Sequence, residues 1–275
     1  MIDLINILGV PIKKVKKTQF LELITQTIEQ NKQLQIATVN AEFLVKANKN
    51  QNFKEILKTT FNVADTVTIL WAGFFIAKMR NLKGFWGKVL IILFYLPSLF
   101  CIFFNRICFH EIPERLSGAD IFWDLARLAN QKKWRVFLLG ASSGVAQKAK
   151  QEMQKYFPNL NIMALMGDNL SEIDLKEKIK SFAPKILFVA YGAPKQEQWL
   201  KDNLQDLNKS LVGIGVGGTL NFVAGDIKRA PSFMRIIGLE WFYRLILEPK
   251  KRAKRIINAV FVFPYLVLKN VLKNS

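Results

Sequence analysis

Cysteine and histidine are scarce in this chain of 275 residues, which contains two cysteines and one histidine. Two cysteines cannot build a disulfide framework or a zinc site of four cysteines, so we expect a reducing compartment. Cys101, Cys108 and His110 all lie in or beside one apolar stretch. A histidine in that position predicts a structural or interfacial role, which argues against a catalytic triad centred on histidine.

Two phosphate-handling motifs are also missing. No Asp-x-Asp occurs, so the usual pair of carboxylates for a nucleotide-bound metal is absent. No G-x-x-x-x-G-K-[ST] loop occurs either. These absences disfavour a kinase or an NTPase, and the shortage of metal ligands disfavours a zinc hydrolase.

Acidic residues are outnumbered, since 21 Asp and Glu face 40 Lys and Arg, for a net charge of +19. Residues 226–275 hold eleven basic and three acidic side chains, and no acidic residue lies between Asp65 and Glu111. Both basic regions are also apolar and aromatic. A folded protein with this net charge is expected to bind an anionic partner. The interleaving of basic and apolar residues favours a lipid surface over nucleic acid.

One long apolar run, Val89 to Phe104, contains no charge over sixteen residues. As a helix it would extend roughly 24 Å, which is short of the ~30 Å hydrocarbon core of a bilayer. Pro97 stands in its middle. A marginal transmembrane helix, an interfacial helix pair broken at Pro97, and a buried core helix all remain open. The N-terminus lacks the pattern of a secretory signal, so we do not expect export.

Short apolar runs alternate with segments of helical length along the rest of the chain. Near-continuous apolar runs of this kind predict strands buried on both faces of a parallel sheet. The fold class is therefore predicted as α/β, a Rossmann-like parallel sheet covered by helices. We expect a body over residues 1–234, with an apolar membrane-seeking insert at about 74–112, and a basic C-terminal membrane-binding appendage over 235–275. The predicted strands are Gln35–Val39, Phe61–Ala64, Lys133–Gly140, Asn161–Met166, Lys185–Tyr191 and Ser210–Val216.

Glycine-rich or polar turns follow several of these strands. Ligands collect at the carboxyl ends of strands in open α/β sheets, where glycine lets the backbone approach a phosphate. The turns Gly140–Gly144, Tyr191–Glu197 and Gly215–Thr219 therefore predict ligand contact, although each also fits a purely structural turn. Asp65 ends another strand and is, on position alone, equally compatible with a cap or turn residue.

Taken together, these motifs resemble the WecG/TagA/CpsF family of glycosyltransferases over nearly the whole chain except the insert. The matching segments are Thr38-x-Asn40-x-Glu42, Asp65, Pro113-Glu114-Arg115 with Gly118-x-Asp120, the Gly140 turn, Gly192-Ala193-Pro194-Lys195-Gln196-Glu197-x-Trp199, Gly215-x-Gly217-Gly218-Thr219 and the block from Gly225 to Pro249. Thr66 follows Asp65, where the family usually has glycine.

The resemblance implies an inverting transferase that moves N-acetylmannosamine, or its uronic acid, from a UDP-sugar to a polyprenyl-diphosphate-linked sugar. It implies that Asp65 is the general base and that Thr38 lines the same pocket. It implies no metal cofactor, and a place on the cytoplasmic face of a bacterial membrane, peripheral or monotopic, with a homo-oligomer left open. The substrate-binding residues that we expect are Asn40, Arg115, Gly140, Gly192, Lys195, Gln196, Glu197, Gly217, Gly218, Thr219, Arg229, Arg235, Arg244 and Arg252.

Two other classes are weighed against this one. A nucleotide-binding oxidoreductase or sensor would use the Gly140 turn, but it needs an acid about twenty residues further on to hold the ribose. The sequence there reads Pro158-Asn159-Leu160-Asn161. A basic nucleic-acid binder would show steep salt dependence. We expect no nucleic-acid partner, because the basic residues are interleaved with large apolar ones.

Overall fold

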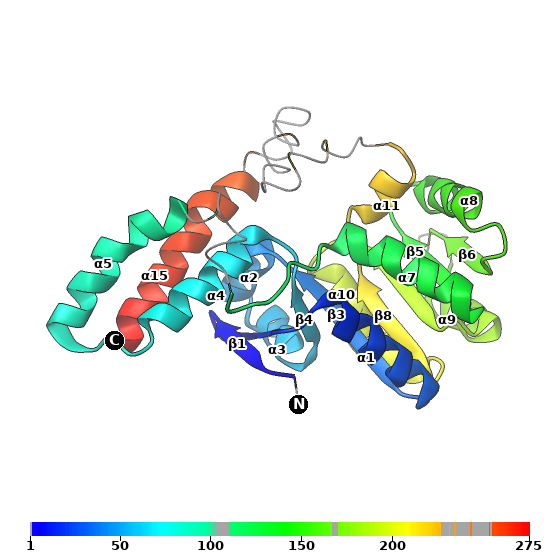
Figure 1. Cartoon of the computed structure of the whole chain (residues 1–275). Helices are drawn as coiled ribbons and strands as arrows, with labels where there is room; N and C mark the ends of the chain where they lie inside the picture. Colours follow the sequence, from blue (N-terminus) through cyan, green and yellow to red (C-terminus); the bar gives the residue numbers. More distant parts are fainter. Residues whose placement is uncertain are drawn as a thin grey trace.

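The computed structural model describes residues 2–100, 110–166, 170–226 and 255–275, together with a few isolated residues between these ranges. Its centre is a six-stranded parallel sheet with the order β4-β3-β8-β7-β5-β6 (Figure 1). The strands are β3 (Gln33–Val39), β4 (Phe61–Ala64), β5 (Val136–Gly140), β6 (Ile162–Leu165), β7 (Ile186–Ala190) and β8 (Leu211–Gly215). The predicted α/β class and all six predicted strands are confirmed.

Helices cover both faces of the sheet. One face packs against α1 (Lys17–Glu29), α7 (Gly118–Lys132), α8 (Val145–Tyr156) and α11 (Thr219–Val223). The other face of β5 and β7 packs against α9 (Glu172–Phe182), α10 (Lys195–Asn203) and the short 3-10 turn η2 (Leu204–Asp206). Because β5, β7 and β8 are buried along their whole length, their continuous apolar sequences follow directly from their position.

A second apolar cluster extends the body beyond β4. It contains a two-stranded antiparallel ribbon, β1 (Leu4–Ile7) and β2 (Val10–Lys13), and the helices α2 (Ala41–Lys49) and α3 (Gln51–Thr59). It continues into α4 (Val67–Met79), α5 (Gly84–Phe100) and the C-terminal helix α15 (Phe263–Asn274). Figure 1 shows α4, α5 and α15 side by side in a projection that reaches away from the sheet.

The apolar run of the sequence lies largely within α5. This helix continues through Pro97 to Phe100, so the break at Pro97 that one of the three interpretations requires does not occur within the described residues. Pro97 lies in the last turn of α5 and has no backbone N–H, so the carbonyl of Leu93 receives no hydrogen bond from position 97. Among the described helices, only the one over Arg255–Asn274 has the length and apolar composition needed to cross a membrane, and both tests are also met by core helices of soluble proteins.

The described part of the predicted C-terminal appendage is helical. Its described helix runs from Arg255 through a π-helical segment, η3 (Asn258–Val262), and continues as α15. Phe263, Val267 and Val271 are buried against the second cluster. The predicted boundary at residue 235 lies outside the described residues.

Candidate active site

A cavity of about 810 Å³ lies at the carboxyl ends of the parallel strands. Side chains or backbone that follow β3, β4, β5, β7 and β8 all reach it, which is the position at which open α/β sheets bind ligands. Of the residues predicted for the site, those that line it are Thr38, Asn40, Asp65, Gly192, Gln196, Gly217, Gly218 and Thr219.

Asp65 follows β4 directly, and its backbone N–H continues the sheet by donating to Val39 O at 2.9 Å. Its carboxylate oxygen Oδ1 accepts a hydrogen bond of 2.8 Å from the backbone N–H of Gly118, in the first turn of α7. This bond fixes the carboxylate at the cavity wall. Thr66, next in the chain, has an extended backbone with φ −126°, so no glycine is needed after Asp65 in this chain.

Thr38 and Gly118 touch across the cavity floor. A Cβ atom placed on Gly118 would come within 3.0 Å of Thr38 Oγ1 and 3.5 Å of Thr38 Cβ. Glycine therefore lets the start of α7 approach β3 closely enough for its N–H to reach Asp65. Thr38, Gly118 and Asp65 form one packed unit.

Asn40 and three ion-paired side chains form another wall of the cavity. Asn40 caps α2, because its side-chain oxygen accepts from Phe43 N at 3.2 Å. Glu42 pairs with Lys46 at 2.9 Å and with Arg255 Nε at 3.3 Å. Lys46 Nζ also donates to the backbone carbonyl of Ala193 at 3.0 Å. Two cations from distant parts of the sequence thus meet at the cavity.

Gln196 joins the turns that follow β7 and β8. Its buried side-chain oxygen accepts from Gly192 N at 3.0 Å and from Gly217 N at 2.9 Å. Its amide nitrogen donates to Glu197 Oε1 at 2.6 Å. The cavity-lining glycines are therefore held by a side chain that satisfies their backbone N–H groups.

Glu197 is fully buried behind this wall and does not line the cavity. Burial raises the pKa of its carboxyl group to about 7. Hydrogen bonding from Gln196 and the charge of Lys46 lower the pKa, but their effect is smaller than that of burial. Its second oxygen, Oε2, has no hydrogen-bond partner in the structure. The structure thus places Glu197 where it can hold Gln196 rather than touch a ligand.

Gly140 has a positive φ of 94°, and a Cβ atom there would lie 2.8 Å from the ring of Tyr191. The glycine is explained by this contact, and the same turn reaches the cavity through Ser142 instead. The packing role also accounts for the glycine on which the oxidoreductase alternative depended.

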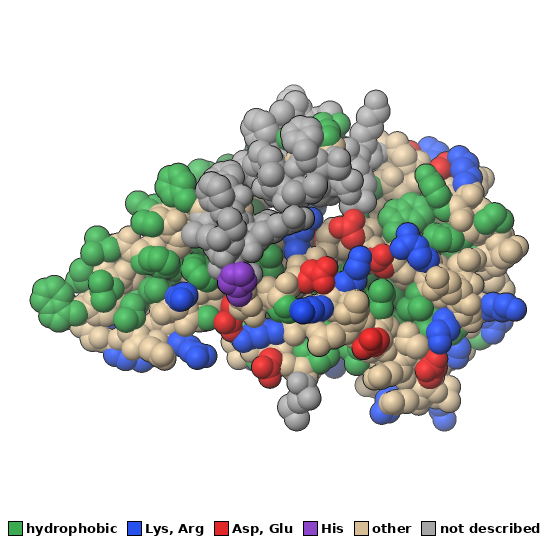
Figure 2. All heavy atoms as spheres, viewed as in Figure 1, with side chains coloured by type: hydrophobic (Ala, Val, Ile, Leu, Met, Phe, Trp, Pro, Cys, Tyr) green, Lys and Arg blue, Asp and Glu red, His purple; other side chains and the backbone are tan. Residues whose placement is uncertain are grey.

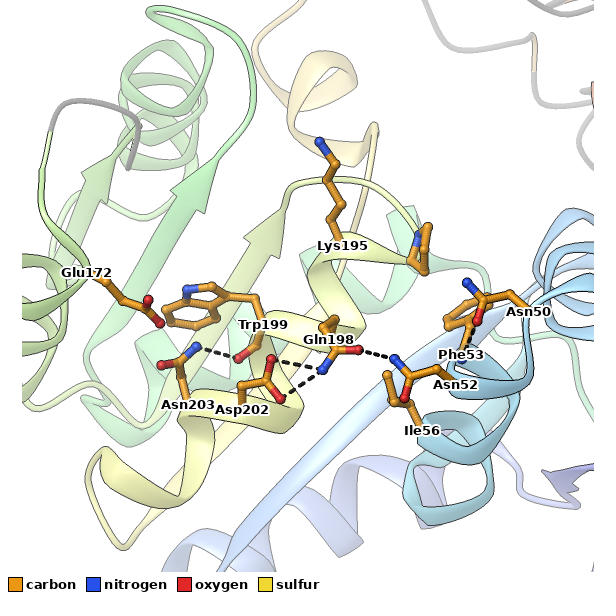
Figure 3. Close-up of a pocket in the computed structure, with 11 residues that line it drawn as sticks. Asn50, Asn52, Phe53, Ile56, Glu172, Lys195, Gln198, Trp199, Asp202 and Asn203 are labelled. Carbon is orange, nitrogen blue, oxygen red and sulfur yellow. Dashed lines mark hydrogen bonds between the residues drawn. The ribbon is translucent and has the colours of Figure 1, made fainter.

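Lys195 lies outside the main cavity and borders a second hollow of about 410 Å³ between α3 and α10. In Figure 3 its side chain points away from the hydrogen-bonded side chains of that hollow. These side chains satisfy one another, since Asn52 donates to Gln198 at 2.7 Å and Gln198 donates to both oxygens of Asp202 at 2.8 and 2.9 Å. The arrangement fastens α3 to α10.

The remaining predicted residues are basic. Arg115 precedes α7 and does not line the cavity. Arg229, Arg235, Arg244 and Arg252 lie outside the described residues. Within the described ranges, no group of three or more His, Cys, Asp or Glu side chains is placed to hold a metal ion.

Several cavity residues were not anticipated from the sequence, namely Lys46, Ser117, Asn221, Asp226 and Arg255. Glu42, Gly118 and Ser142 also line the cavity and lie in motifs or turns that the sequence singled out. For Lys46 a signal existed, because positions 42 and 46 lie four apart on a helix that begins at a strand end and so share one face. Arg255 lies three positions beyond Arg252 in the sequence, in the basic C-terminal segment that was predicted to bind a membrane.

Curated proteins with similar sequences share one description. The chain is 36% identical over 158 residues to an N-acetylglucosaminyldiphosphoundecaprenol N-acetyl-beta-D-mannosaminyltransferase of Bacillus subtilis, which covers 57% of this chain and 61% of that protein. It is 31% identical over 159 residues to a protein of the same description from Staphylococcus aureus, over 58% of this chain and 61% of the other. The matched region thus spans about three fifths of the length of these relatives.

The family model of the WecG/TagA/CpsF glycosyl transferases matches residues 5–84 and 98–275. The residues left out, 85–97, fall within the predicted insert and within α5. The match takes in β1 to β8, the cavity and the C-terminal helix. By this match over nearly its whole length, the chain belongs to the WecG/TagA/CpsF family of glycosyl transferases.

Proposed function

We propose that this protein is an inverting glycosyltransferase that moves N-acetylmannosamine, or its uronic acid, from a UDP-sugar to a polyprenyl-diphosphate-linked sugar. Family membership supports the reaction class. The relatives are named as N-acetylglucosaminyldiphosphoundecaprenol N-acetyl-beta-D-mannosaminyltransferases, which supports the sugar and the lipid-linked acceptor. The product would enter a cell-surface polysaccharide or teichoic acid.

The observation that carries the proposal is the position of Asp65. Its carboxylate lies at the wall of the large cavity, with Oδ1 held by Gly118 N. A carboxylate held at a cavity wall suits a general base that takes the proton of an acceptor hydroxyl, which typically accelerates transfer by about 10²- to 10⁴-fold. The hydroxyl oxygen would then attack the anomeric carbon on the face opposite UDP, so that the C–O bond to UDP breaks with inversion.

The donor would lie against the turns after β7 and β8, where Gly192, Gly217 and Thr219 line the cavity. Negative charge that develops on the departing diphosphate would be stabilised by cations, because arginine forks bind phosphate oxygens in pairs. Arg255 and Lys46 line the cavity and are available for this role. Arg229, Arg235, Arg244 and Arg252, outside the described residues, would add to it.

We propose that the transfer needs no metal ion, since these cations would supply the charge that a metal supplies in other glycosyltransferases. A lipid-linked acceptor further requires that the protein work at a membrane. We propose the cytoplasmic face, with peripheral or monotopic attachment to anionic lipid and no nucleic-acid partner. EDTA in the transfer assay should leave the rate nearly unchanged.

Transfer from UDP-N-acetylmannosamine to a lipid-linked N-acetylglucosamine diphosphate tests the core of the proposal. Asp65→Asn keeps an oxygen for the Gly118 hydrogen bond but removes the base, so turnover should fall by about 10²- to 10⁴-fold while UDP still binds. Asp206→Asn, which alters a largely exposed carboxylate near Lys176, is the matched control. Full turnover in Asp65→Asn would rule out Asp65 as the base.

A further inference from the structure

The helix α5 exposes a large apolar face to its surroundings. Seven of its side chains are between 52% and 75% exposed: Phe85, Trp86, Leu90, Ile92, Leu93, Leu96 and Phe100. Isolated apolar side chains at a protein surface need no explanation, but a continuous apolar face marks an interaction site. Figure 2 shows hydrophobic side chains gathered over the projection that contains α5.

The opposite face of α5 is firmly packed, so the exposure is not a product of a detached helix. Ser98 is buried and its hydroxyl accepts from Trp71 Nε1 of α4 at 3.0 Å. Phe94 stacks on Phe75 of α4 with ring centroids 6.5 Å apart. A helix with an apolar face on each side needs an apolar environment on both. Since α4 covers one side of α5, the exposed side calls for a second apolar environment.

The C-terminal helix presents a stripe of exposed residues at a spacing of four. Ile257, Phe261 and Tyr265 are 53%, 68% and 56% exposed. Lys269 and Lys273, the next two positions of the stripe, are also exposed. The stripe therefore passes from apolar to basic, as in helices that lie at the surface of a bilayer.

Exposed basic residues border the apolar face of α5. Lys78 lies in the last turn of α4, Arg80 and Lys83 lie between α4 and α5, and Lys88 lies in the first turns of α5. The Lys83 ammonium group donates to the carbonyl of Asn274, which brings this turn to the end of α15. Since no acidic residue occurs between Asp65 and Glu111, the border complements an anionic surface.

We propose that α5 and the exposed stripe of the C-terminal helix form a lipid-binding face, with α5 lying in the plane of one leaflet of an anionic bilayer. With 17 residues α5 extends roughly 26 Å, less than the ~30 Å of a hydrocarbon core, and its packed face cannot be surrounded by lipid. The family model omits residues 85–97, which hold most of the exposed apolar side chains of α5, whereas it matches the C-terminal helix that carries the stripe.

The lipid-binding face is connected to the cavity through one helix. Arg255 lines the cavity and belongs to the helix whose later residues carry the exposed stripe. A lipid-linked ligand with its chain in the leaflet and its diphosphate in the cavity would follow this helix. That last step rests on the proposed function, whereas the lipid-binding face itself does not.

Flotation of the purified full chain with vesicles tests the face without any substrate. We expect binding to phosphatidylglycerol–phosphatidylcholine vesicles that is stronger than to phosphatidylcholine alone and weakens with salt. Leu93→Glu should weaken vesicle binding at least tenfold. Ile173→Glu, at a side chain that is similarly exposed but lies on α9, is the matched control and should bind like the wild type.

The melting temperature and oligomeric state of each variant complete the test. Leu93→Glu should melt like the wild type, because its side chain is exposed. Unchanged flotation of a folded Leu93→Glu protein would overturn the proposal. A wild type that ignores vesicles but forms a dimer disrupted by Leu93→Glu would also overturn it, and would assign the face to a second copy. A wild type that floats with vesicles but shows no transfer activity would count against the proposed function and not against the lipid-binding face.

The depth of α5 is measured with brominated lipids. The emission of Trp86 is obtained as the difference between the wild type and Trp86→Phe. Bromines near the headgroup end of the acyl chain should quench this emission more than bromines near the terminal methyl group. Stronger quenching from the bilayer centre would contradict an in-plane helix.

Discussion

The side-chain oxygen of Gln196 accepts a hydrogen bond of 2.9 Å from the backbone N–H of Gly217, which lies twenty-one residues further along the chain. The same oxygen accepts from Gly192 N at 3.0 Å. One side chain thus sets the distance between the turns after β7 and β8. Both turns line the cavity in which we propose that the donor binds.

Gln196→Ala should therefore weaken donor binding more than it slows the chemical step. It leaves two backbone N–H groups without their acceptor and frees both turns, and an unmet buried donor costs about 1–3 kcal/mol. We expect the KM for the UDP-sugar to rise about tenfold or more. Gln198→Ala, which removes only the contacts of Gln198 with Asn52 and Asp202, is the control and should leave the KM unchanged. Equal KM values for the two variants would contradict the role of Gln196.

Glu197 should make stability depend on pH in an unusual direction. Its pKa is about 7 in the folded protein and near 4.5 in the unfolded chain. The folded state therefore binds the proton more tightly, and the free energy of unfolding falls as the pH rises from about 4.5 to 7 and stays low above it. A shift of this size corresponds to about 3 kcal/mol.

Glu197→Gln mimics the protonated carboxyl and removes this titration. Urea unfolding at pH 5 and at pH 8 isolates the effect, because every other ionisable group is shared by the two proteins. The wild type should lose more stability than Glu197→Gln between the two pH values. Parallel pH profiles would show that Glu197 is ionised at both.

The sheet was predictable from the sequence because burial on both faces leaves a direct signature. Runs such as Lys185–Tyr191 and Ser210–Val216 contain no charged or strongly polar residue after their first position, and the strands occupy their centres. The course of α5 was not predictable in the same way. A proline disfavours helix, but tertiary packing of Ser98 and Phe94 against α4 outweighs that local preference.

The site was predicted in part, and the reason differs for each residue. Asp65 and Gly217 follow strands, so their location at the sheet edge is fixed by the strands themselves. Glu197 and Lys195 follow the same strand-end turn, yet one is fully buried and the other exposed, because each position along a helix faces a different direction. Arg255 reaches the cavity through contacts between segments far apart in the sequence, which spacing does not reveal.

Gly215 should be intolerant of a larger side chain. A Cβ atom there would lie 2.5 Å from both Gln196 Nε2 and Glu197 Oε1, which are buried and bonded to each other. Gly215→Ala should lower the free energy of unfolding by about 1–3 kcal/mol through this overlap. Gly218→Ala is the control, since its nearest neighbour is 4.0 Å away and its φ of −76° suits alanine. Similar thermal unfolding of the two variants would disprove the overlap.

Arg255 should affect ligand binding and not stability. Its pairing with Glu42 is more than half exposed on the arginine side, and such pairs contribute roughly 0–1 kcal/mol. Because Arg255 lines the cavity, Arg255→Ala should raise the KM for a diphosphate-bearing substrate about tenfold while the melting temperature stays within a few degrees. Arg255→Lys should recover only part of the loss, since an ammonium group cannot bind two phosphate oxygens as a planar fork does. If Arg255→Ala and the wild type had the same KM for donor and acceptor, the diphosphate would bind elsewhere, and the arginines between residues 229 and 252 would be tested next by the same measurement.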